Sequence, residues 1–230
     1  WLMEKAGIPY PKVFENAKDI DRLALVKVAE AERSYERAFF LCSSPEEFVE
    51  KSNELIEAGR ITKEGLDVAV IEEFVMGAQV NFNYFYSPLK DRLELLGTDM
   101  RRQTNLDGIL RLPAPQQEEV LKYVEAKSIE AGHVACTMKE SLLEQVFELG
   151  EKFVEVSKKE YDPGIIGPFA LQATFIPGPP KETAITFDIS LRVQGSPGTK
   201  FTPYSGYLHR EEMSVGRRIA LEIKNGINEK

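Results

Sequence analysis

The chain has 230 residues, 43% of them hydrophobic and 29% charged, and its 29 basic and 37 acidic side chains give a net charge of −8. This composition is typical of a soluble globular protein with one large domain or two smaller ones. No apolar run approaches the roughly 20 residues that span a bilayer, and no stripe of Lys and Arg interleaves with aromatic residues. We therefore expect a cytoplasmic protein with neither a membrane nor polymeric nucleic acid among its partners. Cys42 and Cys136 lack C-x-x-C spacing, so we expect two buried thiols and no zinc site or disulfide.

Residues 1–75 are predicted to contain the end of a linker helix and then a small α/β lobe. The first helix is expected to stop at Gly7, before an extended segment with two prolines. A second helix begins after Ser44, where an N-cap, a first-turn proline and Glu47 form a capping-box pattern, and Gly59 is placed to close it. Apolar runs predict strands at residues 23–28, 39–42 and 68–74. Together these elements make a small β-α-β unit.

Residues 76–230 are predicted to form a larger α+β lobe. Segments rich in apolar and aromatic residues predict strands at residues 80–86, 93–96 and 109–112. Apolar residues at helical spacing predict a long helix over residues 139–159. Ser214 can cap a last helix, in which one face carries Val215, Ile219, Ile223 and Ile227.

Two apolar segments, residues 167–172 and 186–192, flank a cluster of Pro and Gly near residue 180. This pattern predicts two antiparallel strands joined by a turn, with Gln172 opposite Asp188. Opposed residues lie about 5 Å apart at Cβ, so an amide oxygen and a carboxylate can converge on one Mg²⁺. An ordinary hairpin with a polar face explains the same pattern.

Other polar residues stand where predicted strands end. Lys27 closes an apolar strand, from which its ammonium can pair with a phosphate or simply point into water. The segment Glu72, Glu73, Phe74 and Val75 leaves the small lobe. It offers backbone groups to a purine and a carboxylate to a ribose, or it is a solvated strand end.

A denser polar segment runs from residue 99 to residue 108. Arg101 and Arg102 can fork onto a phosphate or a carboxylate, and Gln103, Asn105 and Asp107 can serve a sugar or a base. The segment lies between two apolar stretches, which favours a binding role over a purely solvated loop.

Two further residues are candidates on their own. His133 can hydrogen-bond a substrate amide, transfer a proton or be structural. Arg192 can meet negative charge on the face that carries Asp188. The sequence indicates no Ser/His/Asp or Cys/His constellation and no Walker A loop, so hydrolytic and P-loop mechanisms lack support.

Seven segments in the same order make the chain similar to one known family. They are 72–77 (EEFVMG), 84–88 (YFYSP), 93–97 (LELLG), 105–108 (NLDG), 140–143 (ESLL), 167–169 (GPF) and 216–220 (GRRIA). Over nearly its whole length the chain resembles the archaeal formate-dependent 5-formaminoimidazole-4-carboxamide ribonucleotide synthetases of purine (IMP) biosynthesis, within the ATP-grasp superfamily. The resemblance implies an α+β fold of two α/β lobes with mainly antiparallel sheets and the nucleotide between them.

The resemblance also implies an activity. Members of that family use ATP and Mg²⁺ or Mn²⁺ to activate formate as formyl phosphate, which the amine of aminoimidazole carboxamide ribonucleotide attacks. Small-molecule substrates and a ring-like homo-oligomer are the partners implied.

The family's functional positions can be carried over residue by residue. The metal positions fall on Gln172 and Asp188. The ATP positions fall on Lys27, Glu72, Glu73, Phe74, Val75 and Gln103. The substrate-binding candidates are His133, Asn105 and Lys139. Arg101 and Arg192 are the catalytic candidates, because a cation offsets the charge of an acyl phosphate.

The chain departs from the family pattern at several positions. Residues 29–38 contain no glycine, where the family has a glycine-rich phosphate loop. Gln103 stands for a usual glutamate, Asn83 for a usual histidine, His133 for a usual asparagine and Lys139 for a usual arginine. The family's N-terminal domain is expected to be absent, since the chain opens at Trp1 without an initiator Met.

These departures favour a diverged paralogue and leave two alternatives open. One is a nucleotide-binding protein without this activity. The other is a carboxylate-amine ligase with a different acceptor.

Overall fold

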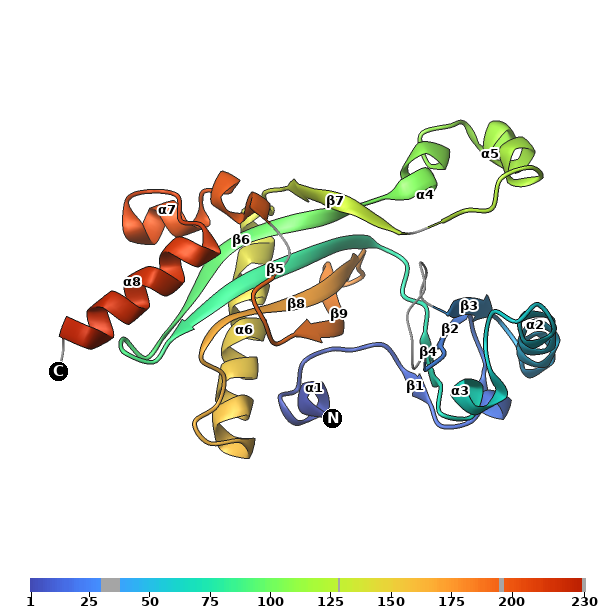
Figure 1. The fold of residues 1–230 in the computed structure, drawn as a ribbon, viewed down its shortest axis with the longest axis horizontal. Helices are drawn as coiled ribbons and strands as arrows, with labels where there is room; N and C mark the ends of the chain where they lie inside the picture. Colours follow the sequence, from blue (N-terminus) through green and yellow to red (C-terminus); the bar gives the residue numbers. More distant parts are fainter. Residues whose placement is uncertain (30–37, 128, 195–196, 229–230) are drawn as a thin grey trace. The chain divides into compact units, whose positions relative to one another are not determined.

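The computed structural model describes residues 1–29, 38–127, 129–194 and 197–228, whose course is drawn in Figure 1. These residues form two compact units. The large unit comprises Trp1–Tyr10, Met76–Arg102 and Glu130–Lys230, and the small unit comprises Pro11–Val75 and Gln103–Ile129.

Helices and strands are mixed along the chain, as an α+β protein requires (Figure 1). The helices are α1 (Leu2–Lys5), α2 (Pro45–Glu57), α3 (Lys63–Asp67), α4 (Thr104–Ile109), α5 (Ala114–Leu121), α6 (Glu140–Glu160), α7 (Tyr204–His209) and α8 (Val215–Asn228), with 3-10 turns η1 (Ala17–Asp19) and η2 (Pro197–Phe201). The strands are β1 (Val13–Phe14), β2 (Ala24–Lys27), β3 (Phe39–Cys42), β4 (Val70–Glu73), β5 (Ala78–Ser87), β6 (Arg92–Gln103), β7 (Glu130–Ala135), β8 (Gly167–Ile176) and β9 (Thr183–Ser190).

The small unit contains a four-stranded sheet in the order β1-β4-β2-β3. Strand β2 pairs antiparallel with both β3 and β4, so β3 and β4 run parallel, and α2 and α3 connect them. This arrangement confirms the predicted β-α-β unit, with β2 inserted between its two strands. The Ser44 hydroxyl accepts the Glu47 amide at 3.2 Å and caps α2 as predicted, while the Glu47 carboxylate accepts the Ser43 amide at 2.6 Å.

The division into units differs from the two continuous lobes, 1–75 and 76–230, expected from sequence. The first ten residues belong to the large unit, because Pro9 accepts a hydrogen bond from the Thr186 amide at 2.8 Å and Ile8 is buried in that core. Residues 103–129 belong to the small unit, where Glu125 pairs with Arg60 at 2.7 Å.

The stretch 109–112, predicted to be a strand, is the end of α4 and a turn. The amide of Leu110 donates to Leu106 at 3.0 Å, and the amide of Leu112 donates to Ile109 at 3.0 Å. The prediction was wrong because a short apolar run does not distinguish a strand from a buried helix end.

The large unit contains a five-stranded sheet in the order β7-β6-β5-β8-β9. Figure 1 shows α6 lying across these strands. On the face that meets α6, Phe82 and Tyr84 of β5 pack with Phe153 and Phe169, and the Tyr84 hydroxyl donates to Val146 at 2.6 Å. This core confirms the long helix predicted over residues 139–159.

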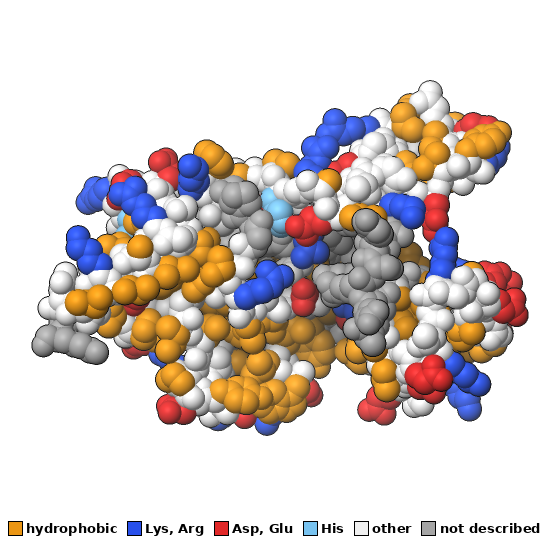
Figure 2. All heavy atoms as spheres, in the orientation of Figure 1, with side chains coloured by type: hydrophobic (Ala, Val, Ile, Leu, Met, Phe, Trp, Pro, Cys, Tyr) orange, Lys and Arg blue, Asp and Glu red, His pale blue; other side chains and the backbone are white. Residues whose placement is uncertain are grey.

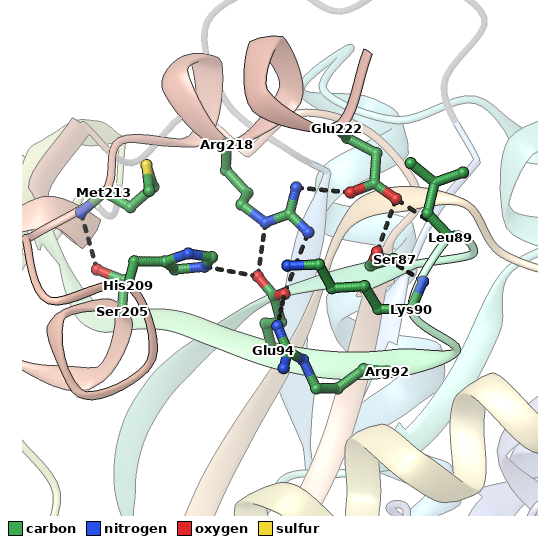
Figure 3. A network of polar contacts seen from close by, with 10 residues as sticks. All are labelled: Ser87, Leu89, Lys90, Arg92, Glu94, Ser205, His209, Met213, Arg218 and Glu222. Carbon is green, nitrogen blue, oxygen red and sulfur yellow. Dashed lines mark hydrogen bonds and ion pairs between the residues drawn. The ribbon is translucent and has the colours of Figure 1, made fainter. Parts of the chain in front are cut away.

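The opposite face of β5 carries Asn81, Asn83, Phe85 and Ser87, because side chains alternate along a strand. Helix α8 covers the end of this face that carries Phe85 and Ser87. Arg218 of α8 lies 4.0 Å from the Phe85 ring centroid. Figure 3 shows how Arg218 meets Glu94 of β6 and Glu222 of its own helix. The end that carries Asn81 and Asn83 is left for the site described below.

The segment before α7 also approaches this face closely. At Gly97 of β6 a Cβ atom would lie 2.6 Å from both the Thr199 carbonyl and the Thr202 hydroxyl. Only glycine lets η2 and its flank approach the strand this closely.

Helix α8 buries only part of the apolar face predicted for it. Val215 is buried and Ile219 packs beside it, whereas Ile223 and Ile227 are 59% and 68% exposed. Figure 2 shows hydrophobic side chains running along this helix. Among the residues that the structure describes, no helix is both long enough and apolar enough to cross a membrane.

Candidate functional site

A row of polar side chains crosses the large unit's sheet. Asn81 of β5 lies opposite Asp99 of β6 on one side and opposite Gln172 of β8 on the other, and Gln172 lies opposite Asp188 of β9. Directly opposed residues point to the same face of a sheet. His133 of β7 extends the row, because its ring bonds to Asp99. We call these five residues the polar row.

The polar row opens onto a pocket of about 180 Å³. Its lining is almost entirely polar and consists of Asn81, Asn83, Asp99, Arg101, Glu130, His133, Ala170, Gln172, Ser190, Arg192 and Gln194. The buried Oε1 of Gln194 accepts no hydrogen bond within the described parts of the chain. Converging polar groups and an unpaired buried acceptor are the features of this pocket that can orient a small polar ligand.

Asp99 is the centre of the hydrogen bonding in this pocket. Asp99 is 0% exposed, and its two carboxylate oxygens accept hydrogen bonds from Asn81 at 2.9 Å and from Asn83 at 2.6 Å. Its Oδ2 atom also meets Nδ1 of His133. A buried carboxylate is costly unless it is hydrogen-bonded, and these three partners satisfy that requirement.

His133 is held between two carboxylates. Its Nδ1 meets Asp99, and its Nε2 lies 2.7 Å from Oε1 of Glu130. Burial of the ring lowers the pKa of His133, but the hydrogen bonds with Asp99 and Glu130 together raise the pKa above its ordinary value of 6.5. The ring therefore favours the imidazolium form, in which both nitrogens donate.

Arg101 links this cluster to the predicted metal residues. Its Nε lies 3.2 Å from Oε2 of Glu130, and its terminal nitrogen donates to Oε1 of Gln172 at 2.7 Å. Gln172 in turn donates through Nε2 to Oδ2 of Asp188 at 2.9 Å. An unbroken chain of polar contacts thus runs from His133 through Glu130 and Arg101 to the Gln172–Asp188 pair.

Two irregularities in the strands lie beside the polar row. The pairing of β5 with β6 shifts register after Asn83, and the pairing of β8 with β9 shifts after Gln172. Bulges next to a site change the direction of side chains locally. The first of them lies where the polar half of the face meets the half that α8 covers, and the second lies on the other side of the polar row.

The Gln172–Asp188 pair suits a hard divalent cation in part. An amide oxygen and a carboxylate are oxygen donors of the kind that Mg²⁺ and Mn²⁺ take, and such ions usually complete their shell with water and substrate phosphates. The Oε1 atom of Gln172 already accepts a hydrogen bond from the positively charged Arg101. Within the described ranges no three His, Cys, Asp or Glu side chains are placed to hold a metal. The pair therefore supplies at most two protein oxygens, and water or ligand oxygens would complete the shell of such an ion.

The structure brings together several of the residues predicted from sequence. Arg101, His133, Gln172 and Arg192 line the pocket, and Asp188 joins them through Gln172. The predicted register of Gln172 opposite Asp188 is confirmed. Arg102, next to Arg101 on β6, points to the other face and is not among the lining residues.

Lys139 stands apart from this pocket. Its ammonium pairs with Glu182, and its side chain is 56% exposed. It precedes α6 and is not among the residues that line the pocket.

The remaining predicted residues belong to the small unit. Lys27 of β2 pairs with Glu72 of β4, and the Glu73 carboxylate meets Arg22 at 3.4 Å. The Phe74 amide donates to Leu23 at 2.9 Å, which extends the sheet toward Val75.

The last two predicted residues begin the second segment of the small unit. The backbone N–H of Gln103 donates to the Asp107 carboxylate at 2.9 Å. Asn105 donates to the Glu125 carbonyl at 2.8 Å and accepts the Lys127 amide at 2.6 Å. Most of the glycine-free loop at 29–38 lies outside the described residues.

Sequence reasoning missed Glu130 and Asn81 as parts of the site, and it gave no role to Asp99, which opens the polar segment 99–108. A signal was present in β5, where Asn81 and Asn83 interrupt an apolar and aromatic run at alternate positions. Two amides on one face of an otherwise buried strand indicate a polar site there, since buried polar groups need partners.

Comparison with known proteins places the chain in a family. A family model described as "Domain of unknown function (DUF1297)" matches residues 47–230. A 5-formaminoimidazole-4-carboxamide-1-(beta)-D-ribofuranosyl 5'-monophosphate synthetase of Methanopyrus kandleri is 40% identical over 97% of this chain. One from Methanocaldococcus jannaschii is 40% identical over the same share. The chain spans 60% of the length of each of these relatives.

Solved structures agree with this placement. The crystal structure of an IMP biosynthesis protein PurP from Thermococcus kodakaraensis covers 99% of this chain and 63% of its own, with a TM-score of 0.66 and 28% identity. A phosphoribosylamine–glycine ligase from Thermotoga maritima has a TM-score of 0.60 at 18% identity, covers 86% of this chain and 47% of its own, and supports the fold alone. These similarities confirm the predicted α+β, ATP-grasp fold class. The match over residues 47–230 shows that the chain belongs to the DUF1297 family.

Proposed function

We propose that the protein containing this chain is an ATP- and Mg²⁺-dependent carbon–nitrogen ligase. It would activate formate as formyl phosphate and transfer the formyl group to the amine of aminoimidazole carboxamide ribonucleotide, in IMP biosynthesis. The named relatives at 40% identity suggest this reaction. The observation that carries the proposal is the polar row, in which Gln172, Asp188 and His133 lie on one face of one sheet.

Different residues of the pocket would have different roles in this reaction. Arg101 and Arg192 offer two guanidinium groups, and positive charge aimed at an acyl phosphate stabilises the charge that develops there. His133, fixed by Asp99 and Glu130, presents a ring of fixed orientation to the acceptor ribonucleotide. Fixed groups lower the barrier because they need no reorganisation during the reaction.

Gln172 and Asp188 are the residues we assign to Mg²⁺ or Mn²⁺. The ion would neutralise phosphate charge on ATP when it is bound. Because the amide carries no charge, Asp188 is the residue on which ion binding most depends.

The small unit supplies the proposed ATP contacts. Lys27 would pair with phosphate, the segment 72–75 would serve the nucleotide, and Gln103 would add an amide. Asn105 and Lys139 remain candidates for substrate binding, although the Asn105 amide is already bonded to residues 125 and 127. A homo-oligomer and a cytoplasmic location likewise stay predictions.

The test is ADP release by the full-length protein that contains this chain, with formate and aminoimidazole carboxamide ribonucleotide. We expect ADP release that requires both substrates and that Asp188→Asn abolishes. The control is Glu148→Gln, which changes a carboxylate on α6 that is 61% exposed and pairs with Lys152. ADP release that is independent of formate overturns this reaction. If ADP is released only with a different ribonucleotide, that ribonucleotide is the acceptor.

A further inference from the structure

Both ends of the Gln172 amide are occupied by other side chains of the protein. Its nitrogen donates to Asp188 at 2.9 Å, and its oxygen accepts Arg101 at 2.7 Å. Gln172 is 5% exposed, so few other partners can reach this oxygen. The amide oxygen is the only atom of the Gln172 side chain that can bind a hard cation. An ion at this pair must therefore share or replace the contact with Arg101.

The contact with Arg101 is strong enough to compete with an ion. A hydrogen bond from a charged donor is about twice as strong as a neutral one. On its other side the guanidinium forms an ion pair with Glu130, whose carboxylate lies 3.2 Å from Nε without a hydrogen bond between them. Glu130 in turn meets His133, which ties Arg101 to the histidine half of the pocket.

We infer that the Arg101 guanidinium is a stand-in for the metal: it occupies the Oε1 atom of Gln172, and the ion must displace it in order to bind. This inference rests on the proposed function, which assigns the ion to Gln172 and Asp188. When the ion takes the amide oxygen, the Arg101 hydrogen bond to Gln172 breaks and the guanidinium stays near Glu130. Its freed N–H groups then face the pocket, where they can meet an anionic substrate. Metal binding and anion binding are coupled through this one side chain.

The second arginine of the pocket provides a matched control. Arg192 carries the same charge and lines the same pocket, but its guanidinium donates to the Val193 carbonyl at 3.4 Å and makes no contact with Gln172 within the described chain. Removing either arginine removes one positive charge near the ion. Only removal of Arg101 also frees the amide oxygen.

The experiment measures binding of Mn²⁺ alone, without nucleotide, to the full-length protein by the EPR signal of the free ion. Arg101→Met is expected to lower the Kd for Mn²⁺ by roughly three- to tenfold more than Arg192→Met does, because a competing charged hydrogen bond is gone. Arg101→Leu also removes both the charge and the hydrogen bond to Gln172, and it replaces Arg101→Met if that variant does not fold.

Three outcomes are separable. Equal tightening in Arg101→Met and Arg192→Met overturns the stand-in role, because charge alone then explains the effect. An Asp188→Asn variant that binds Mn²⁺ as well as the wild type overturns the proposed metal pair itself. Weaker binding in Asp188→Asn, together with selective tightening in the Arg101 variants, supports both.

Discussion

Glu94 and Arg218 lie 124 residues apart in the sequence, yet they form a doubly hydrogen-bonded ion pair in which both side chains are 1% exposed. The two bonds measure 2.6 and 3.1 Å. Figure 3 shows Arg92 and His209 on the same carboxylate and Glu222 on the other side of the guanidinium. This network attaches α7 and α8 to the β5–β6 hairpin, on the face of the sheet that also carries the pocket.

Glu94→Gln is predicted to destabilise the protein strongly. Burial raises the pKa of Glu94, but Arg218, Arg92 and His209 together lower it from 4.5 to about 2. A lowered pKa contributes stability above pH 4.5, and this contribution is lost as the pH falls toward 2. The shift corresponds to about 3 kcal/mol at neutral pH. Urea unfolding from pH 2 to pH 7 should show this difference between wild type and variant shrinking toward acid.

The control for this prediction is Glu211→Gln. Glu211 pairs with Arg217, the neighbour of Arg218, at 2.8 Å, but the two side chains are 49% and 60% exposed. An exposed pair contributes about 0–1 kcal/mol. Equal losses in the two variants would contradict the role assigned to the buried pair.

Asp99→Asn is predicted to disturb the pocket without large structural change. The new amide group would face the donors of Asn81 and Asn83, so at least one buried donor loses its acceptor, at a cost of about 1–3 kcal/mol. The pKa of His133 should fall, since Asp99 helps to raise it. A raised histidine pKa adds stability below pH 6.5 that is lost as the pH rises through the folded-state pKa. The loss caused by the variant should therefore be largest at acidic pH.

Proton NMR can follow this change directly, because the sequence contains only two histidines. Asp91→Asn serves as the control. Asp91 is in the turn of the same hairpin at φ 43, a conformation that asparagine tolerates, and it contacts Lys158 at 2.7 Å and not His133. A His133 titration that is the same in Asp99→Asn and Asp91→Asn would contradict the assigned hydrogen bond.

Two departures from the family pattern are predicted to compensate each other. The resemblance implies that Asn83 replaces a histidine and His133 an asparagine, and in the structure both side chains bond to Asp99. The two sites thus exchange an imidazole and an amide around one carboxylate. Asn83→His combined with His133→Asn should cost less stability than the sum of the single changes, by about 0.5–3 kcal/mol in a double-mutant cycle. Strict additivity would show that the two residues act independently.

Much of the large unit's sheet was predictable from local patterns. The Pro and Gly cluster near residue 180 fixed the register of the last hairpin closely enough to place Gln172 opposite Asp188. The helix after Lys139 followed from its apolar spacing. These features depend on residues near one another in the chain, which is why sequence reasoning reached them.

The features that were missed depend on contacts between distant segments. Asp99 bonds to residues of two other strands only because β6 lies beside both β5 and β7. The sequence of a single strand does not specify its pairing partners. Likewise, nothing near residue 109 shows that residues 103–129 join the small unit, since this depends on contacts such as Arg60 with Glu125. The register of Gln172 opposite Asp188 was therefore predicted, but the network that holds this pair was not.

Gln172→Glu is predicted to strengthen metal binding and to lower the stability of the metal-free protein. A carboxylate at this position would stand opposite Asp188, to which the amide now donates at 2.9 Å. Two such carboxylates repel each other, so one takes a raised pKa and the metal-free variant should be less stable at neutral pH than at pH 5. Arg101 offsets part of this repulsion, because its contact with residue 172 becomes an ion pair.

Thermal unfolding with and without Mn²⁺ checks this prediction. The Tm of Gln172→Glu should start below that of the wild type and rise more on addition of Mn²⁺, since a second carboxylate binds the ion more strongly than an amide. Gln194→Glu is the matched control: Gln194 also lines the pocket, but its side chain donates to the Phe169 carbonyl. The same charge placed there should leave the Mn²⁺ response close to that of the wild type. A larger response in Gln194→Glu than in Gln172→Glu would move the metal away from the Gln172–Asp188 pair.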